Sequence, residues 1–305
     1  PPKSWHNWSQ SGKFENIKLG ADGQGNVYGA WQERMLPEVY NEGNEWPHTI
    51  YEDIRIGLVG LDQITPITTC DGTSGYGASL IDFFVDKMGN MIVVYETRTL
   101  DTRWKYYTWV KRYNVDIGWD DTSVLIAETY NPNRNSLAPP SIAADSSGNA
   151  IIADNDSGTI RALRYDVNQG WQPKIQLAQS SNSYSAKIAM DSSGNAIMIW
   201  SNFNNQEGSF EIHTKMYRAD SGWDDESRRR IASPTQLDLK SLNILMDSQG
   251  NAIVTWHNPE VGIRARHYDA IAGWHQTIAI IANNTAIHPQ DGQLKSQYYA
   301  SMDES

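Results

Sequence analysis

The chain has 305 residues and a formal net charge of −11, which is enough length for one large repeat domain or two ordinary ones. This acidic balance argues against nucleic acid and anionic membranes as partners, because both are bound through basic patches. No apolar run reaches the roughly 18–20 residues of a membrane-spanning helix, and we expect no membrane insertion. The single cysteine, Cys70, excludes an internal disulfide.

A signature Asp-x-x-Gly-Asn recurs along the chain, with successive Asp residues 46 to 64 positions apart. Its five copies begin at Asp22, Asp86, Asp145, Asp191 and Asp247. Gly and Asn tolerate positive φ, and an Asp side chain accepts backbone N–H groups, so each copy predicts a tight turn between two strands. One carboxylate per copy is too few for calcium, which takes six to eight oxygen ligands.

A second signature follows in four of the five units, where a Tyr precedes a Gly-Trp pair and the Trp lies six residues after the Tyr. The pairs are Tyr113 and Trp119, Tyr165 and Trp171, Tyr217 and Trp223, and Tyr268 and Trp274. The spacing within each signature is fixed, whereas the spacing between the two signatures varies. This pattern separates framework from loops in a repeat protein, and we interpret these Trp residues as packing between units.

Each unit predicts four short strands, which we term A to D. Strand A is the apolar run before the Asp, and strand B follows the turn with apolar residues on both faces, which indicates burial on both sides. Strand C alternates polar and apolar residues, and the Gly-Trp pair turns the chain into strand D. Four antiparallel strands per unit, repeated in this way, predict an all-β fold of the β-propeller type.

Five units are complete, and the two chain ends supply parts of another. The complete units span 17–68, 79–128, 139–178, 186–233 and 242–282. Residues 1–16 have the pattern of the end of a preceding unit, and residues 297–305 repeat strand A. Together they predict a single propeller domain over 1–305 with six blades, the sixth formed from both termini. The sequence leaves open that the chain belongs to a longer protein or an assembly.

One unit carries a family resemblance. The stretch "PSIAADSSGNAIIADNDSGTIRALRYD", residues 140–166, resembles an NHL-type propeller repeat of bacterial repeat proteins. The stretch "DSSGNAIMIW", residues 191–200, is similar to the Asp-box turn of sialidase-like propellers but lacks its spacing. The resemblance implies a propeller fold and leaves the function open, since such propellers include lectins, protein-binding platforms and enzymes.

Strand alternation predicts where the functional residues lie. The A–B and C–D turns share one end of each blade, while the variable B–C and D–A connections share the other, which we expect to carry function. The residue nine positions after each signature Asp ends strand B at this variable end. These residues are Trp31, Tyr95, Asp154, Trp200 and Trp256.

The candidate ligand-binding residues lie at or beside these strand ends. They are Trp31, Trp46, Tyr95, Trp104, Asp154, Asn155, Trp200, Asn202, Trp256 and His257. Aromatic rings stack on sugar faces or on partner side chains, and adjacent polar groups fix orientation. Packing between blades is the alternative interpretation of the aromatic residues. The long aromatic loops of the first two units predict one asymmetric site rather than one site per blade.

These patterns favour a non-catalytic, lectin-like binding propeller for a protein partner or a glycan, with no cofactor and no metal. The alternative is a glycoside hydrolase-like enzyme with Asp154, Glu33 and Glu96 at the channel mouth, because glycoside hydrolysis uses two carboxyl groups. The start without Met predicts a mature or trimmed product. The Asn-, Ser- and Trp-rich composition favours an exported bacterial protein, located in the periplasm, at the cell surface or in the medium.

Overall fold

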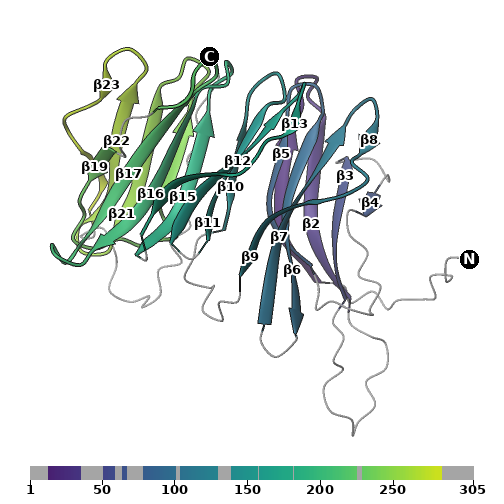
Figure 1. The fold of residues 1–305 in the computed structure, drawn as a ribbon, viewed down its shortest axis with the longest axis horizontal. Helices are drawn as coiled ribbons and strands as arrows, with labels where there is room; N and C mark the ends of the chain where they lie inside the picture. The colour runs from purple at the N-terminus through teal and green to yellow at the C-terminus, as the bar shows by residue number, and fades with distance from the viewer. Residues whose placement is uncertain are drawn as a thin grey trace, which may run out of the picture. The chain divides into compact units, whose positions relative to one another are not determined.

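The structure is a computed structural model that describes residues 13–35, 51–58, 64–66, 78–100, 104–129, 139–156, 158–180, 182–224 and 229–283. The chain divides into two compact units, residues 1–132 and 133–305. The described residues form strands and turns without a helix (Figure 1). No helical segment of the length and hydropathy of a membrane span occurs among them.

The first unit contains two antiparallel sheets, and in each of them the first four strands pair in chain order. Blade 1 consists of β1 (Lys13–Ala21), β2 (Val27–Met35), β3 (Tyr51–Leu58) and β4 (Ile64–Pro66). Blade 2 consists of β5 (Ala78–Val85), β6 (Met91–Leu100), β7 (Trp104–Asn114), β8 (Gly118–Trp119) and β9 (Val124–Thr129). Both β8 and β9 pair with β7, so they are two pieces of one outer strand.

The second unit contains three sheets with the same order and the same divided outer strand. Blade 3 consists of β10 (Ser141–Ala144), β11 (Ala150–Asp156), β12 (Thr159–Asp166), β13 (Gly170–Trp171) and β14 (Ile175–Gln179). Blade 4 consists of β15 (Ser183–Met190), β16 (Ala196–Asn204), β17 (Ser209–Arg218), β18 (Gly222–Trp223) and β19 (Arg229–Ala232). Blade 5 consists of β20 (Asn243–Met246), β21 (Ala252–Asn258), β22 (Gly262–Asp269), β23 (Gly273–Trp274) and β24 (Ala279–Ala282).

The predicted fold class, an all-β propeller of four-stranded antiparallel blades, is confirmed by these sheets. Two details differ from the prediction. The Gly-Trp pair is itself the first piece of strand D, and residues 13–16 belong to β1 of blade 1 rather than to a preceding blade. The other segments assigned to a sixth blade, residues 1–12 and 297–305, lie outside the described residues. The six-blade closure and the single domain therefore stay predictions.

Strand B is buried on both faces, as its apolar pattern predicts, and blade 4 illustrates why. Met198 and Trp200 of β16 pack in a cluster with residues of blade 3. Ile197 and Ile199 point to the opposite face and pack with residues of blade 5. Burying one such side chain stabilises the fold by roughly 1.5–3 kcal/mol, so the stacking of neighbouring blades supplies much of the stability within the second unit.

The A–B turn is held by the Asp of the first signature. In blade 4, Asp191 Oδ1 accepts backbone N–H groups of Ser193 and Asn195 at 2.9 Å, and Asp191 Oδ2 accepts Asn195 Nδ2 at 2.8 Å. The other four copies repeat these three bonds. The signature Gly adopts φ between 84° and 88° in all five copies, a left-handed conformation that favours glycine.

The same Asn joins the A–B turn to the C–D turn of its own blade. Asn195 Oδ1 accepts the backbone N–H of Ala219, and Asn251 Oδ1 accepts that of Ala270. Blades 2 and 3 repeat this bond. The two signatures therefore lie at the same end of each of these blades, which we call the turn end. The opposite end, where the B–C hairpins and D–A connections meet, we call the hairpin end.

Candidate functional site

The hairpin ends differ from blade to blade, and among the described strand pairs at this end that of blade 2 is the longest. Its strands β6 and β7 have 10 and 11 residues, whereas β11 and β12 of blade 3 have 7 and 8. Figure 1 shows β6 and β7 extending past β9 at this end. The stretch 97–109 reads as a loop in the sequence, but the structure places 97–100 and 104–109 in the two strands. An antiparallel ladder thus presents its side chains on a fixed surface.

Alternate residues of β7 form a row of rings on one face of this hairpin. Tyr107 and Trp109 stack with ring centroids 6.1 Å apart and an interplanar angle of 27°. Lys105 Nζ lies 5.0 Å from the centroid of the Tyr107 ring, within cation–π range. Spacing of two residues places all three on the same side of the strand. We call Lys105, Tyr107 and Trp109 the aromatic ladder.

The ladder is held in place by polar contacts. Trp109 Nε1 donates to Thr97 Oγ1 at 2.8 Å, which fixes the orientation of the indole. Lys105 Nζ lies 2.5 Å from Glu128 Oε1 of the neighbouring strand β9. The three ladder side chains are partly exposed. Because the Trp109 and Lys105 side chains are already held by these contacts, binding a ligand on the ladder costs the protein little additional side-chain entropy.

Tyr95 forms the buried base of the ladder. It lies opposite Trp109 in the β6–β7 register, and its side chain is buried in the core of the first unit. Its hydroxyl lies 2.7 Å from Ser123 Oγ, so the phenol is hydrogen-bonded inside the protein. The prediction that Tyr95 presents its ring to a ligand is therefore wrong for this conformation. The partly exposed rings are those of Tyr107 and Trp109, and Trp109 also packs against the core of the first unit.

Two more aromatic residues that were predicted to bind a ligand, Trp200 and Trp256, belong to the core. Trp200 is 0% exposed and stacks on His213, with centroids 5.8 Å apart. Trp256 is 3% exposed and packs with residues of blade 4. Their ring faces are covered by protein, so the packing alternative holds at both positions. Trp31 of β2 is half-buried. Trp46 lies outside the described residues, and Trp104 is described only as the first residue of β7.

Asp154 is paired with an arginine rather than open at a channel mouth. It is 3% exposed, and its Oδ2 lies 2.6 Å from a terminal nitrogen of Arg161, the residue opposite it on β12. The other terminal nitrogen of Arg161 lies 2.9 Å from Asp156. Arg161 thus bridges two carboxylates at this strand end. The odd residue of the series, where other blades carry Trp or Tyr, takes part in an ion-pair cluster.

The two other carboxylates of the enzyme hypothesis lie in blade 1 and blade 2. Glu33 of β2 lies opposite Asp53 of β3. Glu96 of β6 is half-buried and lies opposite Thr108 of β7. Asp154 belongs to the second compact unit, whereas Glu33 and Glu96 belong to the first. Their convergence on one site stays a prediction.

The polar residues predicted to contact a ligand, Asn155, Asn202 and His257, each make a contact within the protein. Asn155 Nδ2 donates to the carbonyls of Ser183 and Tyr184, at 2.9 and 2.7 Å. Asn202 is buried and accepts the Ser183 hydroxyl at 3.5 Å. His257 is also buried, with Nδ1 4.0 Å from Asp238 Oδ2. Asn155 thus joins blade 3 to β15 of blade 4, and His257 lies beside the D–A connection that carries Asp238. All three contacts have a structural role.

Blade 4 contains a buried polar cluster that the sequence did not predict. Glu211 lies 2.8 Å from His213 Nε2 through one oxygen, and its other oxygen accepts Arg230 at 2.9 Å and Asn204 at 3.1 Å. Burial raises the pKa of Glu211, but the hydrogen bonds from Asn204, His213 and Arg230 outweigh it and bring the pKa down to about 2. The Glu-x-His spacing on strand C places both side chains on one face, opposite the Trp200 region of β16, and could have indicated this cluster.

The described residues hold no group of three or more His, Cys, Asp or Glu side chains arranged to bind a metal ion. No protein-family profile matches the sequence. No curated protein sequence matches it significantly either.

Several solved structures resemble this chain at low identity. A lectin from Aleuria aurantia, described as a six-bladed β-propeller with a fucose recognition mode, is 13% identical with a TM-score of 0.43, over 87% of this chain and 78% of its own. An α-L-arabinanase from Penicillium chrysogenum is 14% identical with a TM-score of 0.48, over 85% and 79%. An α-L-arabinofuranosidase from Fusarium graminearum is 12% identical with a TM-score of 0.47, over 88% and 81%. At this level of likeness they do not decide what this chain binds.

Proposed function

We propose that this chain is a carbohydrate-binding propeller that acts without catalysis and binds its ligand on the aromatic ladder of blade 2. The observation that carries the proposal is the partly exposed stack of Tyr107 on Trp109, held by Thr97 and flanked by Lys105. A sugar ring offers an apolar C–H face to an aromatic ring and hydroxyls at its edge. The ladder supplies aromatic rings for the C–H face and polar groups for the hydroxyls on one rigid surface.

The polar groups beside the rings suit hydroxyl-rich ligands. Lys105 donates hydrogen bonds, and its partner Glu128 accepts them, so the pair can bridge neighbouring sugar hydroxyls without a net charge. A protein partner would require a larger apolar patch with buried anchors. The ladder is a narrow row on one strand, which favours an extended chain of sugar rings over a globular partner.

Glycan-array binding tests this proposal, with the intact chain and two variants at one ring. The wild type is expected to bind a limited set of glycans. Tyr107→Ala removes the outer ring and should reduce that signal about tenfold, since the loss of one stacking contact is worth roughly 1.4 kcal/mol. Tyr107→Phe keeps the ring and should bind within about twofold of the wild type.

The array also distinguishes the alternatives. No glycan signal from the wild type would overturn the proposal and favour a protein ligand. A glycan signal that survives Tyr107→Ala unchanged would remove the ladder as its site. Release of free sugar from a bound glycan during incubation would replace the binding function with the glycosidase alternative.

Three further expectations accompany this proposal. The repeat type, with its NHL-like and Asp-box-like features, rests on the Asp-x-x-Gly-Asn pattern of the sequence alone. Bacterial origin and export to the periplasm, cell surface or medium are supported by composition alone. Isolation of the chain from culture medium or a periplasmic extract tests the last of these.

A further inference from the structure

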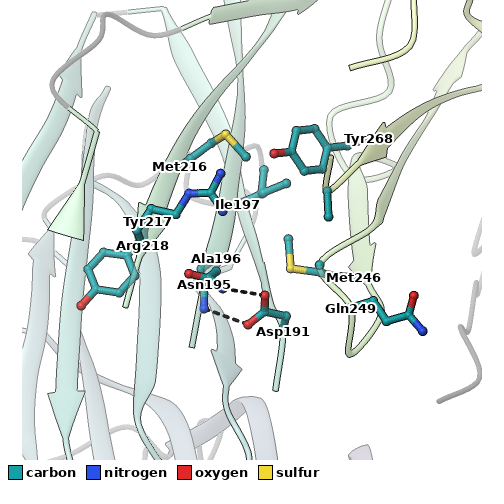
Figure 2. Close-up of a pocket in the computed structure, with 12 residues that line it drawn as sticks. Asp191, Asn195, Ala196, Ile197, Met216, Tyr217, Arg218, Met246, Gln249 and Tyr268 are labelled. Carbon is teal, nitrogen blue, oxygen red and sulfur yellow. Dashed lines mark hydrogen bonds between the residues drawn. The ribbon is translucent and has the colours of Figure 1, made fainter. Parts of the chain in front are cut away.

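A small groove opens at the turn end between blades 4 and 5, away from the aromatic ladder. Its volume is about 80 Å³. The lining side chains that matter here are Ile197, Met216, Arg218, Met246, Gln249 and Tyr268. Figure 2 shows Met216, Ile197 and Met246 around it, with the Arg218 guanidinium on the same side as Ile197 and the Tyr217 ring turned the opposite way.

The corresponding space between blades 3 and 4 is filled by an arginine. Arg164 pairs with Ile151 in the sheet register, as Met216 pairs with Ile197. The Arg164 guanidinium lies 5.7 Å from the ring centroid of Tyr217, the tyrosine of the next blade. Met216 has no such head group, so the space beside Tyr268 stays open and apolar. Methionine side chains adapt readily to a ligand.

The next residue also breaks the repeat. After the signature Tyr, blades 2, 3 and 5 carry Asn114, Asp166 and Asp269. The side-chain oxygen of each accepts two backbone N–H groups of its C–D turn. Blade 4 carries Arg218, which has no acceptor and cannot cap the turn in this way. The C–D turn of blade 4 therefore lacks this side-chain cap.

Arg218 instead places a cation at the mouth of the groove. Its side chain is exposed, and no hydrogen bond or ion pair joins its guanidinium to another described residue. We propose that the groove binds a short aliphatic carboxylate, with the alkyl chain between Met216 and Met246 and the carboxylate on Arg218. A guanidinium and a carboxylate form a charge-assisted, bidentate pair.

The size of the groove sets the length of the ligand. Its volume of about 80 Å³ is roughly half that of an engineered 150 Å³ cavity that binds benzene, which suits an alkyl chain of about three or four carbons. Asp191 also lines the groove, but its carboxylate already accepts three hydrogen bonds. Figure 2 shows Asp191 and Asn195 together at one end, apart from the Arg218 guanidinium.

Titration with butyrate, followed by backbone amide NMR shifts of the whole chain, tests this site. Butyrate should shift amides of 195–197, 216–218 and 246–250 with millimolar affinity. Butyramide, which lacks the charge, and acetate, which lacks the chain, should each bind at least tenfold more weakly. An equal response to acetate or inorganic phosphate would reduce the site to a general anion contact and overturn the proposal.

Two variants use residues that the chain already accepts at equivalent positions. Arg218→Asp restores the cap found in blades 3 and 5, so it should fold at least as stably as the wild type and lose butyrate binding at least tenfold. Met216→Arg places the residue of blade 3 in the groove and should also abolish binding. Undiminished butyrate binding by Arg218→Asp, or no shifts in the wild type at tens of millimolar butyrate, would overturn the proposal. Neither result bears on the glycan ladder.

Discussion

The two ends of each blade follow different rules. At the turn end, five copies of one Asp-x-x-Gly-Asn turn make the same three side-chain hydrogen bonds, and Ser146 and Ser192 each donate to a carbonyl in the turn of the following blade. At the hairpin end, blade 2 presents Tyr107 and Trp109, whereas blade 4 buries Glu211 against His213. One end repeats, and the other varies.

The difference separates stability from recognition. A turn that is the same in every blade cannot distinguish one part of a ligand from another, but it can set the stacking of blades. A hairpin that varies is free to carry a ring, a charge or an extension without disturbing that stacking. Substitutions of the repeated turn residues should therefore change the free energy of unfolding, and those on the blade 2 hairpin should change glycan binding.

The largest expected effect is at a buried turn carboxylate. Asp191→Ala leaves two backbone N–H groups and the Asn195 amide without their acceptor, which should cost roughly 3–5 kcal/mol in the free energy of unfolding. Asp247→Ala removes the same three bonds at a half-exposed turn, where water replaces the carboxylate, and should cost about 1–2 kcal/mol. Urea denaturation measures both. Equal losses would show that burial of the turn does not matter.

A pH-dependent effect should arise from Glu211 at the hairpin end of blade 4. Its pKa falls from 4.5 to about 2 on folding, so its stabilising contribution is complete above pH 4.5 and is lost as the pH falls toward 2. The contribution is about 3 kcal/mol, since one pKa unit corresponds to about 1.4 kcal/mol. Glu211→Gln should lose this stability at pH 7 and approach the wild type at pH 2.

Urea denaturation between pH 7 and pH 2 follows the difference between these two proteins. Arg230→Gln removes one of the three hydrogen-bonding partners of Glu211 and should lose part of the same contribution. A stability difference between wild type and Glu211→Gln that stays constant across this pH range would contradict the account.

A smaller effect distinguishes two glycines with nearly the same backbone. Gly194 has φ 85° and Gly222 has φ 84°, so alanine is strained at both by about 1 kcal/mol. A Cβ at Gly194 would also lie 3.0 Å from Asp145 Oδ2 of the preceding blade, whereas nothing lies within 4 Å of one at Gly222. Gly194→Ala should cost about 2 kcal/mol and Gly222→Ala about 1 kcal/mol. Matching thermal shifts for the two would remove the contact between blades as a cause.

The repeat signatures predicted the turn end well, because turn chemistry is local. The signature Asp accepts hydrogen bonds from residues two and four positions later, so the motif alone predicts the turn. The apolar residues on both faces of strand B predicted neighbouring blades on both sides. The hairpin end was harder to predict. Whether Trp200 faces ligand or core depends on His213 and on blade 3, which no spacing in strand B reveals.

The features that the sequence did not predict also depend on relations between residues far apart in the chain. Trp109 became a candidate only when the register placed Thr97 and Tyr107 beside it in a long hairpin that the sequence presents as a loop. Arg218 stood out only against the capping oxygens of Asp166 and Asp269. In both cases the informative relation is between residues far apart in the chain or between equivalent places in different blades.

The division between the two ends is tested most directly by measuring stability and glycan affinity on the same two variants. With a glycan found by the array, Tyr107→Ala should lose about tenfold in affinity while its free energy of unfolding changes by less than about 1 kcal/mol. Gly194→Ala should lose about 2 kcal/mol of stability and bind that glycan like the wild type. Loss of affinity in Gly194→Ala, or its retention in Tyr107→Ala, would contradict the account.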